Sequence, residues 1–163
     1  DQLQADKIHL ADKIWEPACG GGHLSHVLQR RFPFVLSSDI VMRYKNAEQC
    51  DFLEILPTYS WGGDILTNPP FRHAEAFLRQ GLRFVKKNRY VILLQRIMFL
   101  ESAKRHKLFQ EFPPKYVYIH SSRIAIAKGG DFEKYAKGGR SMCFAWYVWE
   151  KGFKGEPTLR WIR

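Results

Sequence analysis

The sequence predicts a doubly wound α/β fold built on a mostly parallel sheet. Three features carry this prediction. Residues 13–15, with apolar Ile14 and Trp15, are predicted to form a short strand that leads to a glycine triplet and then to a segment with helical spacing. A second apolar run ends at Asp39. Residues 90–94 form a continuous apolar run, the pattern of a central parallel strand that is buried on both faces.

The first 63 residues provide the opening strand, helix and strand. The strand at 13–15 stops at Glu16 because Pro17 cannot donate to a sheet ladder. Residues 23–31 are predicted to be helical because their apolar side chains share one face: Leu24, Val27 and Leu28. A second strand follows at 34–39. We expect polar connections in the remainder, at 44–49 and 57–63.

The middle of the chain repeats this alternation. A strand at 64–66 stops at two prolines, and a helix is predicted from 74 to 85 by the spacing of Ala74, Phe77, Leu78, Leu82 and Val85. After the strand at 90–94, the stretch 95–112 is expected to be helical in its middle, and Pro113-Pro114 ends it.

The last third is aromatic and basic. We predict strands at 116–120 and 141–150, with a further edge strand at 158–162. Residues 121–140 are polar, basic and rich in glycine, which is typical of a loop; both a nucleic-acid contact and a plain solvated connection fit this composition. Trp146, Tyr147 and Trp149 are interpreted as core residues rather than as base-stacking surfaces.

Length and composition indicate one domain, residues 1–163, with a core large enough to fold unaided. No apolar run approaches the roughly 18 residues that span a bilayer, so we expect no membrane contact. Three widely spaced cysteines argue against a disulfide framework or a metal site and favour a reducing cytoplasm.

Charge is unevenly distributed. Residues 1–63 hold 6 Lys or Arg and 8 Asp or Glu, a net charge of −2, whereas residues 64–163 hold 20 and 8, a net charge of +12. A strongly basic second half favours a polyanionic partner such as nucleic acid, although a basic surface can also serve solubility alone.

Two turns carry the candidate chemistry. The glycine triplet Gly20-Gly21-Gly22 allows close backbone approach to a ligand, and no Lys-Ser/Thr follows it as in a phosphate-binding loop. Asp39, at the end of the second strand, can accept hydrogen bonds from ribose hydroxyls. The second turn, residues 68–71, presents the Asn68 amide and a proline carbonyl as fixed acceptors beside the ring of Phe71. Such a site suits a planar group that bears an amine.

These motifs resemble those of class I S-adenosylmethionine-dependent amino-methyltransferases, in particular small phage- or prophage-type DNA adenine-N6 enzymes. The resemblance covers roughly residues 14 to 163 and rests on five stretches: 14–22, 37–40, 50–53, 68–71 and 145–152. It implies a seven-stranded Rossmann-like sheet with an antiparallel strand near the C-terminus, S-adenosylmethionine as cofactor, and a cytoplasmic site of action in a bacterial or phage-infected cell. The family has a longer helix before its first strand, so the resemblance also suggests a chain trimmed at the N-terminus.

The resemblance implies three groups of site residues. The catalytic group is Asn68, Pro69, Pro70 and Phe71. The cofactor group is Glu16, Pro17, Ala18, Cys19, Gly20, Gly22, Asp39, Ile40, Asp51, Phe52 and Asn68, in which Asp51 takes the adenine amine and Phe52 packs on the ring. From their basic character we add as nucleic-acid contacts Arg72, Arg96, Arg123, Lys128, Lys137 and Arg140.

Other activities share the tetrapeptide, so alternatives stay open. RNA adenine-N6 and protein-glutamine methyltransferases also carry it, although the protein-glutamine enzymes usually have Tyr at the position of Phe71. An inactive relative that only binds nucleic acid is a third possibility. No separate target-recognition domain is evident. Sequence specificity is therefore expected to be low, or to reside in residues 121–140, in the basic helix after Gln95, or in a partner chain.

Overall fold

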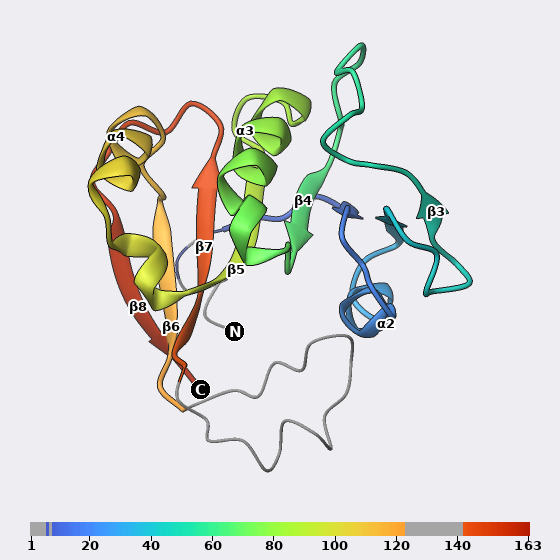
Figure 1. Cartoon of the computed structure of the whole chain (residues 1–163), viewed down its shortest axis with the longest axis horizontal. Coiled ribbons are helices and arrows are strands. Elements are labelled where there is room, and N and C mark those ends of the chain that lie inside the picture. The colour runs from blue at the N-terminus through green and yellow to red at the C-terminus, as the bar shows by residue number, and fades with distance from the viewer. Residues whose placement is uncertain (1–5, 7, 123–141) are drawn as a thin grey trace.

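The computed structural model describes residues 6, 8–122 and 142–163, which form an eight-stranded sheet with helices packed against it (Figure 1). The strand order is β3-β2-β1-β4-β5-β7-β6-β8. The strands are β1 (Lys13–Glu16), β2 (Phe34–Asp39), β3 (Glu48–Gln49), β4 (Asp64–Thr67), β5 (Tyr90–Arg96), β6 (Tyr116–His120), β7 (Phe144–Glu150) and β8 (Thr158–Ile162).

The sheet is parallel apart from β7. β1 pairs in parallel with both β2 and β4, and β4 pairs in parallel with β5. β7 lies antiparallel between β5 and β6. The predicted class, a mostly parallel doubly wound sheet with an antiparallel strand near the C-terminus, is therefore confirmed.

The sheet has one strand more than the seven that the resemblance implied, and the additional strand is β3. β8 joins the outer edge of β6 in parallel, as the alternation at 158–162 predicted. β3 forms where a connection was expected, so that expectation was wrong. Its two residues pair with Ser38 and Asp39 and are too few to show any periodicity in sequence.

The helices are α2 (His23–Gln29), α3 (Ala74–Phe84) and α4 (Ala103–Glu111), with 3-10 turns η1 (Phe71–His73) and η2 (Ile97–Leu100). α2 is two residues shorter than predicted. The crossovers through α2 and α3 extend the sheet in opposite directions from β1 and β4, and right-handed crossovers then place these two helices on opposite faces. Ser102 precedes α4 as its N-cap, and its side chain accepts the N–H of Arg105 at 3.3 Å.

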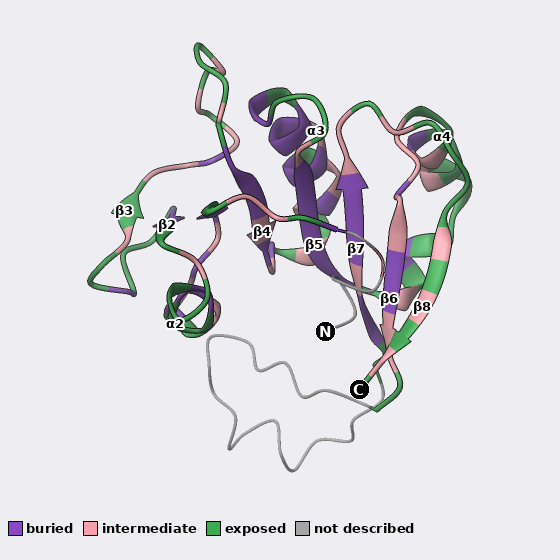
Figure 2. Ribbon diagram, turned by 180° about the vertical axis from the view of Figure 1, so that it is seen from behind, coloured by how far each residue is buried: buried purple, intermediate pink, exposed green. Residues whose placement is uncertain are grey.

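The main core lies between the sheet and the helices α3 and α4. Figure 2 shows β4, β5, β7 and the inner side of α3 as the buried part of the molecule. The largest fully buried side chains include Trp15, Tyr147, Trp149, Phe84 and Leu93. Tyr147 and Trp149 are 0% and 1% exposed, which confirms that they are core residues. A smaller cluster lies on the opposite face and includes Ile8 from the segment before β1.

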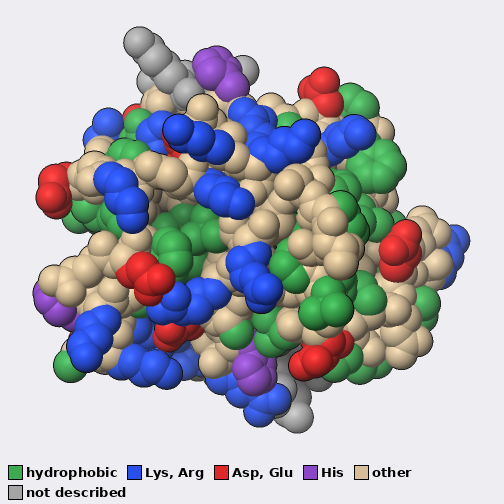
Figure 3. Space-filling model, turned by 90° about the horizontal axis from the view of Figure 1, so that it is seen from above, with side chains coloured by type: hydrophobic (Ala, Val, Ile, Leu, Met, Phe, Trp, Pro, Cys, Tyr) green, Lys and Arg blue, Asp and Glu red, His purple; other side chains and the backbone are tan. Residues whose placement is uncertain are grey.

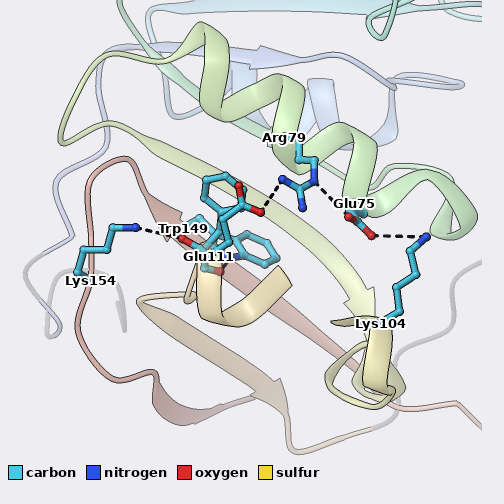
Figure 4. Close-up of polar contacts among 7 residues, drawn as sticks. Glu75, Arg79, Lys104, Glu111, Trp149 and Lys154 are labelled. Atoms are coloured by element: carbon cyan, nitrogen blue, oxygen red, sulfur yellow. Dashed lines mark hydrogen bonds and ion pairs between the residues drawn. The ribbon is translucent and has the colours of Figure 1, made fainter. Parts of the chain in front are cut away.

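A polar network joins α3 to α4 and to the turn after β7 (Figure 4). The Arg79 guanidinium donates to Glu75 at 3.1 Å and to Glu111 at 2.8 Å. Lys154 reaches the Glu111 carbonyl at 3.2 Å, and Trp149 donates its indole N–H to the Phe112 carbonyl at 3.0 Å. These contacts link the two helices and the turn after β7 across the top of the core.

None of the helices in the described ranges is long and apolar enough to cross a membrane.

Candidate functional site

The candidate site lies along the edge of the sheet where the parallel strands β3, β2, β1, β4 and β5 end. These strands are consecutive neighbours, so the segments after Glu16, Asp39, Thr67 and Arg96 emerge at one edge. The order of the sheet reverses between β1 and β4, which makes this point a topological switch, the usual ligand site of an open α/β sheet. The glycine loop follows β1 and the diproline turn follows β4. The two turns are therefore adjacent.

The glycine loop has the left-handed backbone that its composition allows. Gly20 has φ 53° and Gly22 has φ 80°. A Cβ at Gly22 would lie 2.6 Å from the Cγ of Tyr44, so the Tyr44 ring packs directly on this glycine. The Gly22 N–H donates to the Cys19 carbonyl at 2.8 Å, and the Cys19 N–H donates to the Ser38 carbonyl at 3.0 Å. The loop is thus fixed both from within and from β2.

Glu16 ends β1 and is 1% exposed. Its carboxylate accepts the hydroxyl of Ser25 on α2, which lies 2.6 Å from the hydroxyl of Ser37 on β2. Burial raises the pKa of Glu16 to about 7; the hydrogen bond from Ser25 acts against this shift and the charge of Asp39 adds to it. The carboxyl at the base of the glycine loop therefore titrates close to neutral pH.

Cys19 lies within the same loop and is 6% exposed. Burial, together with the nearby carboxylates of Glu16 and Asp39, raises the pKa of the Cys19 thiol to about 11. A thiol in that state is a small packing group rather than a nucleophile.

Asp39 ends β2 and uses both carboxylate oxygens on neighbouring backbone. One oxygen accepts the Gly20 N–H at 2.8 Å, and the other accepts the Val41 N–H at 2.9 Å. Each oxygen keeps a second lone pair for a ligand. The next residue, Ile40, is 58% exposed and gives the site an apolar side chain beside this carboxylate.

Asp51 and Phe52 follow β3 but differ in exposure. Asp51 is half-buried and accepts the Leu53 N–H at 2.9 Å. Phe52 is 2% exposed, and its ring lies edge-on to Trp15 at 5.1 Å and tilted against Phe77 at 5.2 Å. The ring thus belongs to the core, and the expectation that it packs on a bound adenine does not match its place in this structure. A third aromatic neighbour, Phe84, lies 5.8 Å away between ring centroids, so the Phe52 ring is enclosed by aromatic side chains.

The diproline turn leaves polar atoms without partners. The Asn68 Oδ1 is buried, and no hydrogen-bond partner exists for it in the described part of the chain; the same holds for the hydroxyl of Thr67. Pro69 is buried and Pro70 is exposed. The Pro70 carbonyl accepts the His73 N–H at 2.8 Å, which closes the turn into η1. A buried acceptor without a donor costs free energy, and a hydrogen-bond donor on a ligand would remove that cost.

Phe71 follows the turn and is half-buried. Its ring centroid lies 5.7 Å from that of Phe144, the buried first residue of β7. The Arg96 guanidinium carbon lies over the Phe71 ring, 4.9 Å from its centroid. Sequence reasoning found Phe71 and Arg96 separately but missed their contact, because their strands become neighbours only in the folded sheet.

The predicted nucleic-acid contacts are only partly placed. Arg72 and Arg96 are exposed at the carboxyl ends of β4 and β5. The other four, Arg123, Lys128, Lys137 and Arg140, lie outside the described residues. Figure 3 shows Lys and Arg side chains spread over the opposite end of the sheet, where α3 and β7 finish. Exposed basic charge is therefore not confined to the candidate site.

Sequence reasoning also missed Tyr44, the Ser25–Ser37 pair and Gln95. Gln95 is 1% exposed, and its amide nitrogen has no partner within the ranges described. A polar residue at the end of an otherwise apolar strand was the signal that could have identified it. Among the residues that the structure describes, no group of three His, Cys, Asp or Glu side chains could hold a metal ion.

The fold matches the Rossmann-like fold of solved structures assigned to class I S-adenosylmethionine-dependent methyltransferases and to other methyltransferases. A protein assigned to this class from Listeria monocytogenes superposes with a TM-score of 0.59 at 14% identity, over 91% of this chain and 57% of the other. An assigned O-methyltransferase from Agrobacterium tumefaciens gives a TM-score of 0.66 at 11% identity, over 94% and 80%. An assigned RNA methyltransferase from Pyrococcus horikoshii gives 0.61 at 13% identity, over 93% and 80%.

The chain thus spans little more than half the length of the Listeria protein. No family model matches the sequence, and no curated protein matches it either.

Proposed function

We propose that this protein transfers a methyl group from S-adenosylmethionine to the exocyclic amine of a nucleobase, with adenine N6 in DNA as the favoured substrate. The buried, unpartnered Oδ1 of Asn68 carries the proposal. It lies at the end of β4, beside the glycine loop that follows β1. An amide acceptor in this position fits an amine donor and has no structural use of its own.

The residues after β1, β2 and β3 fit the cofactor. Gly20 and Gly22 have no side chains, so the backbone there can approach a bound cofactor closely. The Tyr44 ring packs against Gly22. Glu16 would bind an ammonium group, Asp39 the ribose hydroxyls, and Asp51 the adenine amine, with Ile40 against the adenine ring. The remaining members of the predicted cofactor group, Pro17, Ala18 and Cys19, would line the same loop. Bound there, S-adenosylmethionine supplies an electrophilic methyl group.

The diproline turn would prepare the nucleophile. An aromatic amine is a poor nucleophile because its lone pair is delocalised into the ring. Asn68 Oδ1 and the Pro69 carbonyl would accept the two N–H bonds of the amine and favour a pyramidal nitrogen, and Pro70 would keep the turn rigid. Phe71 would stack on the base. Preorganised acceptors and alignment of this kind lower barriers by several kcal/mol.

A duplex substrate would need its base turned out of the stack, at a cost of a few kcal/mol. Phosphate contacts from Arg72, Arg96 and the predicted cations at 123–140 would offset that cost. A nucleic-acid substrate is favoured because residues 64–163 carry a net charge of +12, which attracts a polyanion.

The test is transfer of labelled methyl groups from S-adenosylmethionine to DNA, RNA and ribosomal extract offered in parallel. We expect DNA to be labelled, and Asn68→Ala to reduce the rate by about 10²- to 10³-fold. Asn88→Gly is the matched control, because Asn88 lies before β5 at the other end of the sheet and its φ of 63° suits glycine.

Each alternative has its own outcome. Label in RNA but not in DNA would assign an RNA enzyme, and label in ribosomal protein a protein-glutamine enzyme. No label in any substrate, with calorimetry showing nucleic-acid binding but no cofactor binding, would reject the enzyme in favour of a binding module. For a DNA enzyme, methylome sequencing in a methylation-free host would reveal the recognition sequence.

A further inference from the structure

The stacking ring of the candidate site is already covered by a guanidinium. We propose that Arg96 occupies the face of Phe71 in the free protein and that an incoming nucleobase displaces it, after which the guanidinium binds a neighbouring phosphate. This inference rests on the proposed function, because it takes Phe71 to be the ring on which the target base stacks.

The contact is built by three strand ends. Phe71 follows β4, Arg96 ends β5 and Phe144 begins β7. Arg96 and Phe144 are direct partners in the antiparallel pair β5–β7, so their side chains project from the same face of the sheet. Phe71 contacts both, with its centroid 4.9 Å from the Arg96 guanidinium carbon and 5.7 Å from the Phe144 centroid.

Hydrogen bonds hold the backbone around Arg96, but none is formed by its side chain with the described residues. The Tyr147 hydroxyl donates to the Arg96 carbonyl at 3.2 Å, and the Ile97 N–H donates to the Cys143 carbonyl at 2.9 Å. The Arg96 guanidinium makes no ion pair or side-chain hydrogen bond with any described residue. Within the described ranges, the Phe71 ring is the one group that the guanidinium contacts.

Two other arginines show what an anchored pair of this kind looks like. Arg79 lies over Phe112 at 5.2 Å but also pairs with Glu75 and Glu111. Arg105 lies over Phe99 at 4.6 Å but also donates to the carbonyls of Met98 and Glu101. Arg96 lacks any such second anchor among the residues described, so its release breaks one contact alone.

The energetics favour exchange. An exposed cation–π contact is weaker than the stacking of a base on an aromatic ring. A base can therefore replace the guanidinium, and the released group has the planar, bidentate geometry that suits phosphate. Arg96 would thus keep the Phe71 ring covered in the free protein and hold the strand in the complex.

Binding of two fluorescent probes to Arg96→Ala distinguishes the two roles of Arg96, covering the Phe71 ring and binding phosphate. The first is 2-aminopurine deoxyriboside, which has no phosphate; the second is a short single-stranded oligonucleotide that contains 2-aminopurine. Both are titrated with S-adenosylhomocysteine saturating, so that the cofactor pocket cannot take the probe. We expect the nucleoside to bind about two- to fivefold more tightly to Arg96→Ala than to the wild type, the gain set by the lost cation–π contact. The oligonucleotide should bind more weakly, with a salt slope that is smaller by about 0.7.

Arg79→Ala is the matched control, because it removes an arginine from a phenylalanine ring away from the site and should leave both affinities unchanged. Unchanged nucleoside affinity in Arg96→Ala with a weakened oligonucleotide would make Arg96 an ordinary phosphate contact and overturn the exchange. Weaker binding of both probes with a lowered Tm would make it a structural support, which also overturns it.

The methyl-transfer assay shows which proposal has failed. A wild type that methylates nucleic acid while Arg96→Ala gains no nucleoside affinity contradicts only the exchange. A wild type that neither transfers methyl groups nor binds either probe contradicts the proposed function and the exchange together.

Discussion

The two ends of β4 treat buried polar groups in opposite ways. Asp64, at the start of the strand, is 0% exposed and accepts the N–H groups of Ala11 and Tyr90 at 2.6 and 2.7 Å, with the Arg89 guanidinium at 3.6 Å. Asn68, just past the other end, has a buried Oδ1 with no partner in the described ranges. The chain thus satisfies a full buried charge at one end and leaves a weaker acceptor open at the other.

We interpret Asp64, at the start of β4, as a structural residue and Asn68, after its end, as a ligand-binding residue. Satisfied buried polar groups hold elements together, and here Asp64 ties the segment before β1 to the start of β5. An unsatisfied buried group only costs stability unless a ligand uses it. Mutations at the amino end of the sheet should therefore affect folding, and those at the carboxyl end should affect binding and turnover.

The largest expected effect is at Asp64. Asp64→Ala leaves two backbone N–H groups and the Arg89 cation without their acceptor, which should lower the free energy of unfolding by about 3–5 kcal/mol. Urea denaturation followed by circular dichroism and tryptophan fluorescence measures this loss. Asn68→Ala is the paired control and should change stability by less than about 1 kcal/mol, because it removes a group that bonds to nothing described. Equal losses in the two variants would contradict the division.

Glu16 gives the next largest effect, through pH. Its carboxyl pKa is raised by burial from an ordinary 4.5 to about 7, so the folded protein binds this proton more tightly than the unfolded chain. The resulting stabilisation is complete below pH 4.5 and is lost as the pH rises towards 7, at about 1.4 kcal/mol per pH unit, or about 3 kcal/mol in all. Glu16→Gln should remove this slope. Urea denaturation of both proteins between pH 5 and 8 measures it, and parallel pH profiles would contradict the shift.

The same carboxyl offers a binding measurement. If Glu16 binds the ammonium group of the cofactor, binding at pH 7 must release about half a proton from the wild type, because a carboxyl with a pKa of about 7 is half protonated there, and none from Glu16→Gln. Calorimetry in two buffers of different ionisation enthalpy detects that proton. Identical binding enthalpies in the two buffers would show that Glu16 keeps its protonation state and takes no part in cofactor binding.

The features that the sequence could predict are those with local causes. Pro17 stops β1 and the two prolines after Asn68 stop β4, so both turns and the parallel strands before them were visible in the residues themselves. Helix α3 was visible as an apolar face at helical spacing.

The remaining features depend on residues that meet only after folding. Phe52 is in the core because Trp15 and Phe77 lie beside it, 37 residues before it and 25 after it in the chain. Tyr44 packs against Gly22 although helix α2 and strand β2 separate them in the chain. The Arg96 guanidinium covers the Phe71 ring from the end of a neighbouring strand. No periodicity records such contacts, which is why a ring expected on the cofactor proved to be packed against the sheet.

Gly22 gives a smaller effect that combines strain with site geometry. Gly22→Ala puts a Cβ on a residue with φ 80° and within 2.6 Å of the Tyr44 ring. The left-handed backbone alone costs about 1–2 kcal/mol. Displacement of the loop should weaken cofactor binding, measured by calorimetry, by about tenfold or more. Gly21→Ala is the matched control, since its nearest contact would be the exposed His23 side chain at 3.2 Å. Cofactor affinity that stays at the wild-type value in Gly22→Ala would show that the cofactor does not use this loop.

The smallest effect is expected at Arg79, away from both ends of β4. Its side chain is 41% exposed and that of its partner Glu111 is 53% exposed, so solvent screens the pair despite the 2.8 Å contact. Arg79→Ala should lower the free energy of unfolding by less than about 1 kcal/mol, and the difference should shrink in 1 M salt, where screening is nearly complete. Urea denaturation at low and high salt measures both. A loss as large as that of Asp64→Ala would mean that charge rather than the buried aromatic core holds α3 to α4, and the contrast between a structural and a functional end of the sheet would then no longer account for the molecule.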